Sequence, residues 1–371
     1  MTTRAMALRA GLCALFLALS PCLGAAQPVA LEEPAEAANA TPTEKIGFSR
    51  GSFIVAPVPF RNPVLGSGVA VGGAYLFKDT LGADTSTLGL AYFRTEEGSE
   101  GYGLGVDLNF GLTGWKSTLL LGDLSLNYDL FVNGTPLPVR QTGTGAKLKF
   151  ARSLSDTVSL GAGLSYLRSD LAAGNGAILP PSLQPDAKLE LAKISFSTDW
   201  DTRDNTDYPT AGRLARAELS YGHLLNARGR DYWKGVGSLS GYHPVFDRGV
   251  LAWTVTGCSA TEDAPFFDAC SLGGTDAFRG YGATEFIDSA LMSGQIEYRG
   301  RLVGRLGYVA FAGLGGSGSR LGSVFDAGLR GAAGLGARIR LSKSFPVDYA
   351  IDLSRNSDGE GLLYVYVGQR F

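Results

Sequence analysis

The chain has 371 residues, of which 45% are hydrophobic and 18% charged, with a formal net charge of −2 and 52 glycines. A balance this close to neutral excludes a broad basic surface, so nothing indicates nucleic-acid binding. Beyond the N-terminal leader, no apolar run is long enough to cross a bilayer as a helix. The composition therefore leaves a soluble all-β protein or a transmembrane β-barrel.

Residues 1–26 have the three-part plan of a secretory signal peptide. Arg4 and Arg9 precede a short apolar core at residues 11–19, and small residues follow it. We predict cleavage after Ala26. The mature protein is then expected in an oxidising compartment outside the cytoplasm.

The segment after the leader, residues 27–47, is rich in Ala, Glu, Pro and Thr and has no periodicity, which predicts a flexible periplasmic lead-in. A lipoprotein anchor on Cys22 is the alternative, and the proline before that cysteine disfavours it. We expect one folded domain over residues 48–371. It keeps an even pair of cysteines, Cys258 and Cys270.

From residue 51 onward, apolar and polar residues alternate with period two, and we count sixteen candidate strands. Successive side chains point to opposite faces of a strand, so we expect the apolar faces to meet lipid and the polar faces to line a wet lumen. The clearest runs set Leu104, Val106 and Leu108 against Asp107 and Asn109, and Leu124, Leu126 and Tyr128 against Asp123 and Asn127.

A water-soluble β-sandwich is the alternative, since its strands also alternate. Sandwich strands usually run about five to six residues, whereas tilted membrane strands need roughly nine to eleven. The strand lengths favour the membrane. Closure is expected as well, because an open edge in lipid leaves backbone groups without partners.

Connector lengths give an independent check on the strand count. Starting from a periplasmic N-terminus, the longest connectors, 172–187 and 261–285, fall on the outer side. Short reversals at 111–115, 153–156 and 246–249 fall on the periplasmic side, as expected for outer-membrane barrels. The long loop at 261–285 follows the eleventh strand.

The first candidate strand, residues 51–58, is the weakest. Pro57, Pro59 and Pro63 cannot donate to a ladder, which suits a sheet edge or a seam. Without this strand the count becomes fifteen, and the topology fails at its start.

The loop at 261–285 has no apolar periodicity, and loops of this length usually have a function. Cys258 and Cys270 could close a local disulfide, and two free, partly buried thiols are the alternative. Arg279 lies near the loop tip between aromatic residues, where we expect its guanidinium to be paired inside the protein. A solvated surface arginine is the other reading.

The sequence Phe278-Arg279-Gly280-Tyr281, with its place after strand eleven, resembles the outer-membrane assembly-factor superfamily, also called the bacterial surface antigen family. This family includes BamA, TamA and the two-partner secretion transporters. The resemblance implies that the loop folds back into the barrel lumen, where the arginine of this motif docks on acidic residues of the following strands.

Glu297 is the best partner for Arg279, because it alternates with apolar neighbours and should face the lumen. Asp326 is a less certain contributor. The family also uses an aspartate on the next strand, in a Phe-x-Asp-x-Gly pattern. The matching run here is 311–315, in which Gly313 replaces that aspartate, so one of two acidic anchors is missing.

Two further segments carry the resemblance. Residues 199–212 are similar to the family's polar turn before the ninth strand. The chain departs from the assembly factors in one respect, since residues 27–47 leave no room for their periplasmic POTRA domains. The C-terminus alternates and ends on an aromatic residue, which looks like the signal that barrel-insertion machinery reads: Tyr364, Tyr366, Gly368 and Phe371.

Candidates for chemistry are few. The two histidines, His223 and His243, have no recognisable catalytic partner, and Cys258 and Cys270 do not match zinc spacing. The polar turn at 199–212 does not match an EF-hand calcium loop. We predict no enzyme, no metal and no cofactor.

The sequence therefore predicts an integral outer-membrane barrel that inserts or translocates protein or lipid through a plugged lumen and a lateral seam. Its expected partners are outer-membrane lipids, the insertion machinery during biogenesis and a separate periplasmic protein. A passive diffusion pore and a surface-exposed adhesion or structural barrel are the alternatives.

Overall fold

The computed structural model describes residue 48 and residues 51–77, 86–111, 113–206, 208–227, 229–246, 249–274, 278–340 and 348–371. Within these residues, sixteen antiparallel strands close into one barrel. They are β1 (Ser52–Asn62), β2 (Gly66–Phe77), β3 (Ser86–Thr95), β4 (Glu100–Phe110), β5 (Trp115–Val132), β6 (Thr135–Ser153), β7 (Val158–Ala173), β8 (Lys188–Asp201), β9 (Gly212–Leu224), β10 (Asp231–Val245), β11 (Gly249–Ala260), β14 (Ala290–Arg301), β15 (Leu306–Gly318), β16 (Arg330–Arg340), β17 (Asp348–Asn356) and β18 (Gly361–Val367).

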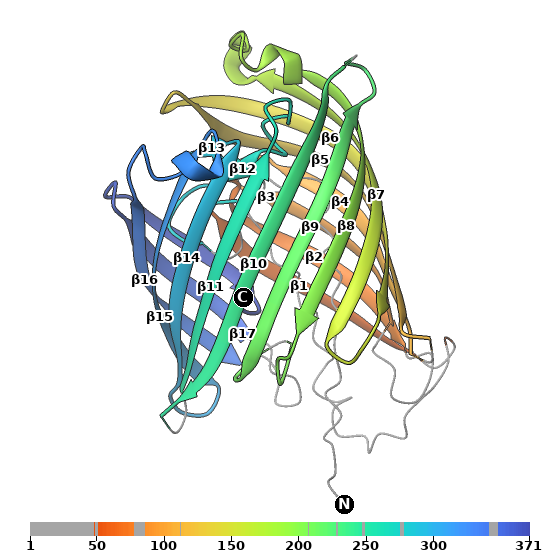
Figure 1. Cartoon of the computed structure of the whole chain (residues 1–371), viewed down its shortest axis with the longest axis vertical. Coiled ribbons are helices and arrows are strands. Elements are labelled where there is room, and N and C mark those ends of the chain that lie inside the picture. The colour runs from red at the N-terminus through yellow and green to blue at the C-terminus, as the bar shows by residue number, and fades with distance from the viewer. Residues whose placement is uncertain are drawn as a thin grey trace, which may run out of the picture.

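Each barrel strand pairs with its neighbours in sequence, as Figure 1 shows for β9, β10, β11 and β14. The ring is closed by pairing of β18 with β1. The interruption between β11 and β14 is the long loop, which holds its own two-stranded ladder of β12 (Cys270–Ser271) and β13 (Ile287–Asp288). The strand count and the position of this loop after the eleventh strand are confirmed. Closure also excludes an open β-sandwich.

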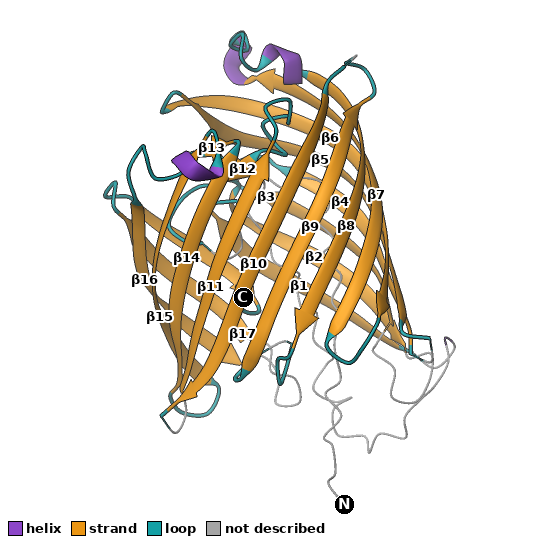
Figure 2. Ribbon diagram, in the orientation of Figure 1, coloured by secondary structure: helices purple, strands orange, loops and turns teal. Residues whose placement is uncertain are grey.

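Short 3-10 helices occur only in connections within the described residues, and strands form the wall (Figure 2). They are η3 (Gly174–Gly176), η4 (Gln184–Asp186) and η5 (Leu321–Ser323). None of the described helices has the length and hydropathy that crossing a membrane requires.

The wall of β14 shows the expected two faces. Gln295, Glu297 and Arg299 are buried, whereas Met292 and Ile296 on the opposite face are exposed. Because successive side chains of a strand point to opposite sides, the polar set faces the barrel interior and the apolar set faces outward.

One predicted face is wrong. Leu124, Leu126 and Tyr128 on β5 do not meet lipid: they are buried, in a hydrophobic core that also contains Leu183 and Phe266 from two connecting loops. The strand has 18 residues, more than the roughly nine to eleven needed to cross the hydrocarbon. Its far end therefore stands beyond the membrane, where the inner side packs against loops and the outer side meets water.

The seam between β1 and β18 is thinly paired. Its register rests on one residue pair, Arg61 opposite Val365, whereas β1 pairs with β2 along its full length. The carbonyl of Pro59 accepts a hydrogen bond from the Tyr349 hydroxyl of β17 at 3.2 Å, so this residue's backbone faces the seam. In an antiparallel strand the N–H and C=O of one residue point the same way, so the donor that proline lacks is missing on the seam side.

Candidate functional site

The candidate site is the loop between β11 and β14 together with the wall it contacts. A disulfide joins Cys258 of β11 to Cys270 of β12, with Cα atoms 5.9 Å apart. The short ladder pairs Cys270 with Asp288 and Ser271 with Ile287. The middle of the loop is thus fixed to the strand that precedes it and to the chain that leaves it.

Arg279 is fully buried and its guanidinium is bonded on several sides. Nε and Nη2 donate to Gln295 Oε1 at 3.0 and 2.9 Å, Nη1 donates to Asp352 Oδ2 at 2.6 Å, and Nη2 donates to Glu297. The guanidinium carbon lies 3.6 Å from the ring centroid of Phe311. Burial would lower the pKa of Arg279, but the two carboxylates outweigh it and hold the pKa above its ordinary value.

Glu297 bridges two arginines. Its second oxygen accepts from Arg299 Nε at 2.6 Å, and Nη2 of Arg299 donates to the main-chain carboxylate oxygen of Phe371 at 2.6 Å. One carboxylate therefore links the loop tip to the C-terminal residue.

Asp352 is the second acidic anchor. It accepts hydrogen bonds from Arg338 and from the Tyr366 hydroxyl, the latter at 2.7 Å, besides its bond with Arg279. Asp326, the less certain candidate, is exposed in the connection between β15 and β16. The acidic anchor that the family motif places at position 313 is thus supplied here from β17.

Gly313 is explained by the aromatic residue of the loop tip. A Cβ at this position would lie 2.9 Å from Cε2 of Phe278 and 2.8 Å from the carbonyl oxygen of Gly294. The ring of Phe278 occupies the space that a side chain at position 313 would need, which leaves room only for glycine.

Gly280 is required by both conformation and space. Its φ is +126°, and a Cβ would lie 2.2 Å from that of Ala332. Its N–H donates to the Tyr364 hydroxyl at 2.9 Å, and its carbonyl accepts from Asn356 Nδ2 at 3.0 Å. The backbone of the tip is therefore held by β17 and β18.

The two aromatic residues of the motif stack on each other. The ring centroids of Phe278 and Tyr281 are 6.0 Å apart with an interplanar angle of 8°. The Tyr281 hydroxyl lies 2.9 Å from Ser357 Oγ and donates to the carbonyl of Gly331 at 3.2 Å. All four motif residues, 278–281, thus contact the sector of the barrel formed by β14 to β18.

The predicted C-terminal residues lie close to this same cluster. Tyr364 and Tyr366 are buried and bonded to the loop or to Asp352, and Gly368 has a φ of +97° that turns the last residues out of β18. Phe371 ends beside Arg299. Whether these residues also form an insertion signal remains a prediction.

A second ionic cluster holds the first half of the loop. Asp268 is 1% exposed and accepts from Lys193 Nζ at 2.7 Å, from Lys234 Nζ at 3.1 Å and from the Tyr232 hydroxyl. Burial alone would raise the pKa of the Asp268 carboxyl, but the two lysine charges outweigh it and bring the pKa to about 2. Sequence analysis missed this cluster.

The polar turn between β8 and β9 is held by its own side chains. Arg203 forms a bidentate ion pair with Asp201, in which Nη2 donates to Oδ2 at 2.8 Å and Nε donates to Oδ1 at 2.9 Å. Tyr208 reaches the opposite strands, where its ring centroid lies 4.6 Å from the guanidinium carbon of Arg301 and 5.2 Å from that of Arg340. These contacts fix the turn against the neighbouring wall.

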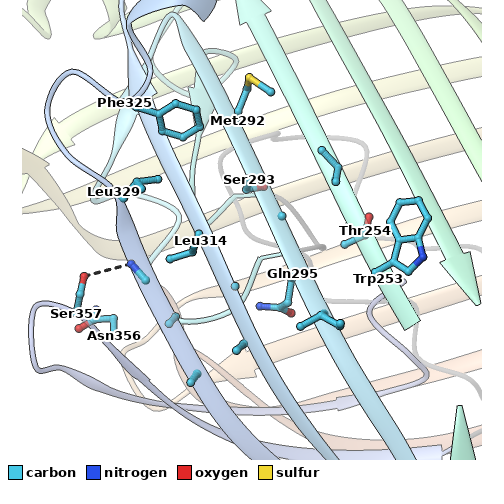
Figure 3. Close-up of a pocket in the computed structure, with 18 of the residues that line it drawn as sticks. Trp253, Thr254, Met292, Ser293, Gln295, Leu314, Phe325, Leu329, Asn356 and Ser357 are labelled. Carbon is cyan, nitrogen blue, oxygen red and sulfur yellow. Dashed lines mark hydrogen bonds between the residues drawn. The ribbon is translucent and has the colours of Figure 1, made fainter. Parts of the chain in front are cut away.

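On the outside of the same sector, an open apolar groove of about 1050 Å³ crosses β11, β14 and β15 (Figure 3). Its side chains include Met292, Leu314, Phe325 and Leu329, all exposed. The groove therefore opens on the lipid-facing side of the wall, and Gln295 of the Arg279 cluster lies in the strand that forms its floor.

The histidines lie elsewhere. His223 Nδ1 is bonded to Asp231 at the end of the β9–β10 hairpin, and His243 is exposed on β10. Within the described residues, no group of three or more His, Cys, Asp or Glu side chains is placed to hold a metal ion.

Fold, strand alternation and buried loop define an integral outer-membrane β-barrel. Residues 91–371 match the family model of the Omp85 superfamily domain, and the chain belongs to this superfamily. In sequence, the chain matches no curated protein.

Three solved structures are similar to this chain in fold. BamA from Haemophilus ducreyi lacking POTRA domains 1–3 has a TM-score of 0.58 at 15% identity, over 86% of this chain and 70% of that one. CdiB from Acinetobacter baumannii has a TM-score of 0.57 at 12% identity, over 86% and 59%. CdiB from Escherichia coli has a TM-score of 0.57 at 16% identity, over 84% and 62%. This chain thus spans 59 to 70% of the length of these structures.

Proposed function

We propose that this chain acts without chemistry in outer-membrane biogenesis, inserting or translocating polypeptide or lipid. The loop between β11 and β14 folds into the lumen and closes it. The seam between β1 and β18 parts to give a lateral path into the membrane. No residue takes a catalytic role.

The observation that carries this proposal is the pairing of Arg279 with Glu297 and Asp352. Removing one partner from a buried ion pair of this kind lowers the stability of the folded protein by roughly 3–5 kcal/mol. The loop is therefore held where it is, and not merely resting on the wall.

The loop also bonds to a distant part of the wall. Thr284 Oγ1 donates to the carbonyl of Asp129 on β5 at 2.8 Å, and the N–H of Phe131 donates to the carbonyl of Thr284 at 3.3 Å. β5 and β17 are not neighbours in the sheet order, and Arg279 is bonded to β17. Because the loop is bonded to both β5 and β17, these contacts support a closed lumen.

The seam supports the lateral path. A strand pair that rests on one register position, with Pro59 facing it, separates at lower cost than a fully paired neighbour. Lipids of the outer membrane would meet this opening directly. The insertion machinery acts on the chain during its own assembly, and a separate periplasmic protein delivers the client.

A disulfide across the seam tests the path. Cysteines at Arg61 and Val365, which lie opposite each other, should lock the seam and block function until a reductant is added. The matched control places cysteines at Leu335 and Leu353, opposite each other in the fully paired β16–β17 ladder, where a cross-link should not change function. Full function of the locked seam variant would contradict lateral opening.

Depletion of the protein separates the two client classes. Loss of other outer-membrane proteins with unchanged lipid composition identifies a polypeptide client, and altered lipid asymmetry with unchanged proteins identifies a lipid client. If depletion changes neither the outer-membrane proteins nor the lipids, the result contradicts a role in biogenesis.

A diffusion pore is the alternative function, because sixteen strands enclose a lumen wide enough for solutes. A pore conducts steadily, whereas a barrel closed by its loop does not. Single-channel recordings therefore distinguish the two.

A further inference from the structure

The loop between β11 and β14 carries two buried ionic anchors of opposite sign. In one, Asp268 of the loop meets Lys193 and Lys234 of the wall. In the other, Arg279 of the loop meets Glu297 and Asp352 of the wall. Because the signs are reversed, neither loop residue can take the other's place.

The two anchors contact different strands of the barrel wall. Lys193 lies on β8 and Lys234 on β10, whereas Glu297 lies on β14 and Asp352 on β17. Asp268 and Arg279 therefore hold different stretches of the loop against different strands.

A clamp separates these stretches. The disulfide of Cys270 with Cys258 and the β12–β13 ladder fix the loop between the anchors, and the N–H of Leu272 donates to the carbonyl of Phe286 at 3.1 Å. We call residues 261–269 the first lobe, and residues 272–274 and 278–286 the second lobe.

Each lobe has a hydrophobic cluster of its own. Phe267 of the first lobe is buried with wall residues Leu189, Leu191, Leu224 and Tyr232. The second lobe contributes a separate cluster, made of Leu272, Phe278, Tyr281 and Ala332, the last from β16. Burial of each lobe therefore does not depend on the apolar contacts of the other.

The first lobe is also tied to neighbouring outer loops. Asp186 of η4 accepts from the N–H of Phe266 at 2.9 Å and pairs with Arg230 at 2.6 Å. Arg230 Nε in turn donates to the carbonyl of Asp263 at 3.2 Å. The second lobe is bonded to β5, β14, β17 and β18 instead.

We infer that Asp268 is a positioning residue for the first lobe, and that the barrel is closed by two lobes that can be released separately. This inference rests on the proposed function only in taking the loop as the lumen closure. Loss of the Asp268 charge frees the first lobe, and loss of Arg279 frees the second.

Thiol labelling of single cysteines follows each lobe separately in the folded, detergent-purified chain under non-reducing conditions. The reporters are Ala264→Cys, half-buried in the first lobe, and Ala283→Cys, buried in the second. Asp268→Asn should raise the labelling rate at position 264 by about tenfold or more, because buried Lys234 and half-buried Lys193 lose their counter-ion, and leave position 283 unchanged. Arg279→Ala should raise the labelling rate at position 283 and leave the rate at position 264 unchanged.

Glu262→Gln is the matched control, since it makes the same carboxylate-to-amide change on an exposed residue of the first lobe and should leave both rates unchanged. If Asp268→Asn does not fold, as judged by heat-modifiable migration, Tyr232→Phe removes one hydrogen bond to Asp268 and should raise the rate at 264 by about threefold.

Equal acceleration of both reporters by either variant would show one rigid loop and overturn the inference. Unchanged labelling at position 264 in a folded Asp268→Asn protein would overturn it too. Labelling reports lobe release and not conduction, so a failure of lumen closure, seen as unchanged conductance on deleting residues 262–284, is distinguishable from either result.

Discussion

Arg299 donates a hydrogen bond to the main-chain carboxylate oxygen of Phe371, the last residue of the chain, at 2.6 Å. The same guanidinium is bonded through Nε to Glu297, which also pairs with Arg279. The end of the chain, just beyond the thinly paired β18, is thus connected to the loop tip through two side chains of β14. Movement of the loop tip and of the C-terminal residues should be coupled.

Replacing Arg299 with Met tests this coupling. The variant keeps much of the side-chain volume but removes the bond to Phe371 and one partner of Glu297, so the last residues should become susceptible to carboxypeptidase. Arg355→Met, which alters an exposed arginine on β17, is the control and should leave digestion unchanged. Equal resistance of both variants would argue against an anchored C-terminus.

Asp352 should matter far more than Asp326. Asp352→Asn leaves Arg279 and Arg338 with a neutral partner in a buried site, so the barrel should lose about 3 kcal/mol of stability, visible as a lower temperature for the change to heat-modified migration. Asp326→Asn changes an exposed residue and should have no measurable effect. A similar shift for the two variants would contradict the assignment of Asp352 as the second anchor.

Restoring an aspartate at position 313 should weaken the loop and not strengthen it. The new side chain would collide with Phe278 and with the Gly294 carbonyl, which should cost about 1–3 kcal/mol and increase protease cleavage of the loop. Gly257→Ala is the control, because a Cβ there meets nothing within 4 Å. Greater protease resistance of Gly313→Asp would show that the position is free to hold an acidic anchor.

The docking of the second lobe should depend on pH through Glu285. Burial raises the pKa of this carboxyl from 4.5 to about 7, despite the hydrogen bond that it accepts from the N–H of Gly282. The docked lobe binds this proton more tightly than the released lobe. Protonated Glu285 therefore stabilises the docked lobe fully below about pH 4.5, and this stabilisation is lost as the pH rises to about 7.

Labelling at position 283 should therefore accelerate between pH 5 and 8 beyond the intrinsic rise in thiol reactivity, measured on an unfolded reference. Glu285→Gln has no charge to gain and should remove this excess while still accepting the bond from Gly282. An excess that persists unchanged in Glu285→Gln would assign the pH dependence to another group.

The strands, their number and the motif of the loop were predictable because they are local. Period-two alternation fixes the face of Glu297 on its own strand, and the sequence 278–281 is continuous. The partner Asp352 lies 73 residues from Arg279, and no local pattern joins them. Alternation within β17 carries a usable signal, since Asp348, Asp352 and Asn356 fall on the same face.

Two other features escaped prediction for physical reasons. The inner side of β5 changes from polar to apolar along its length, because the strand leaves the membrane and meets the loops, so Leu124 and Leu126 were assigned to the wrong face. Asp268 pairs with Lys193 and Lys234, which are 75 and 34 residues away and on different strands. Only closure of the barrel brings these charges together.

Single-channel conductance of the folded chain, with and without residues 262–284, tests the central claim most directly. If the loop closes the lumen, the intact barrel conducts weakly with flickering current, and the deletion variant conducts steadily at a much higher level. A large, steady conductance that is the same in both proteins would show an open pore and contradict the account.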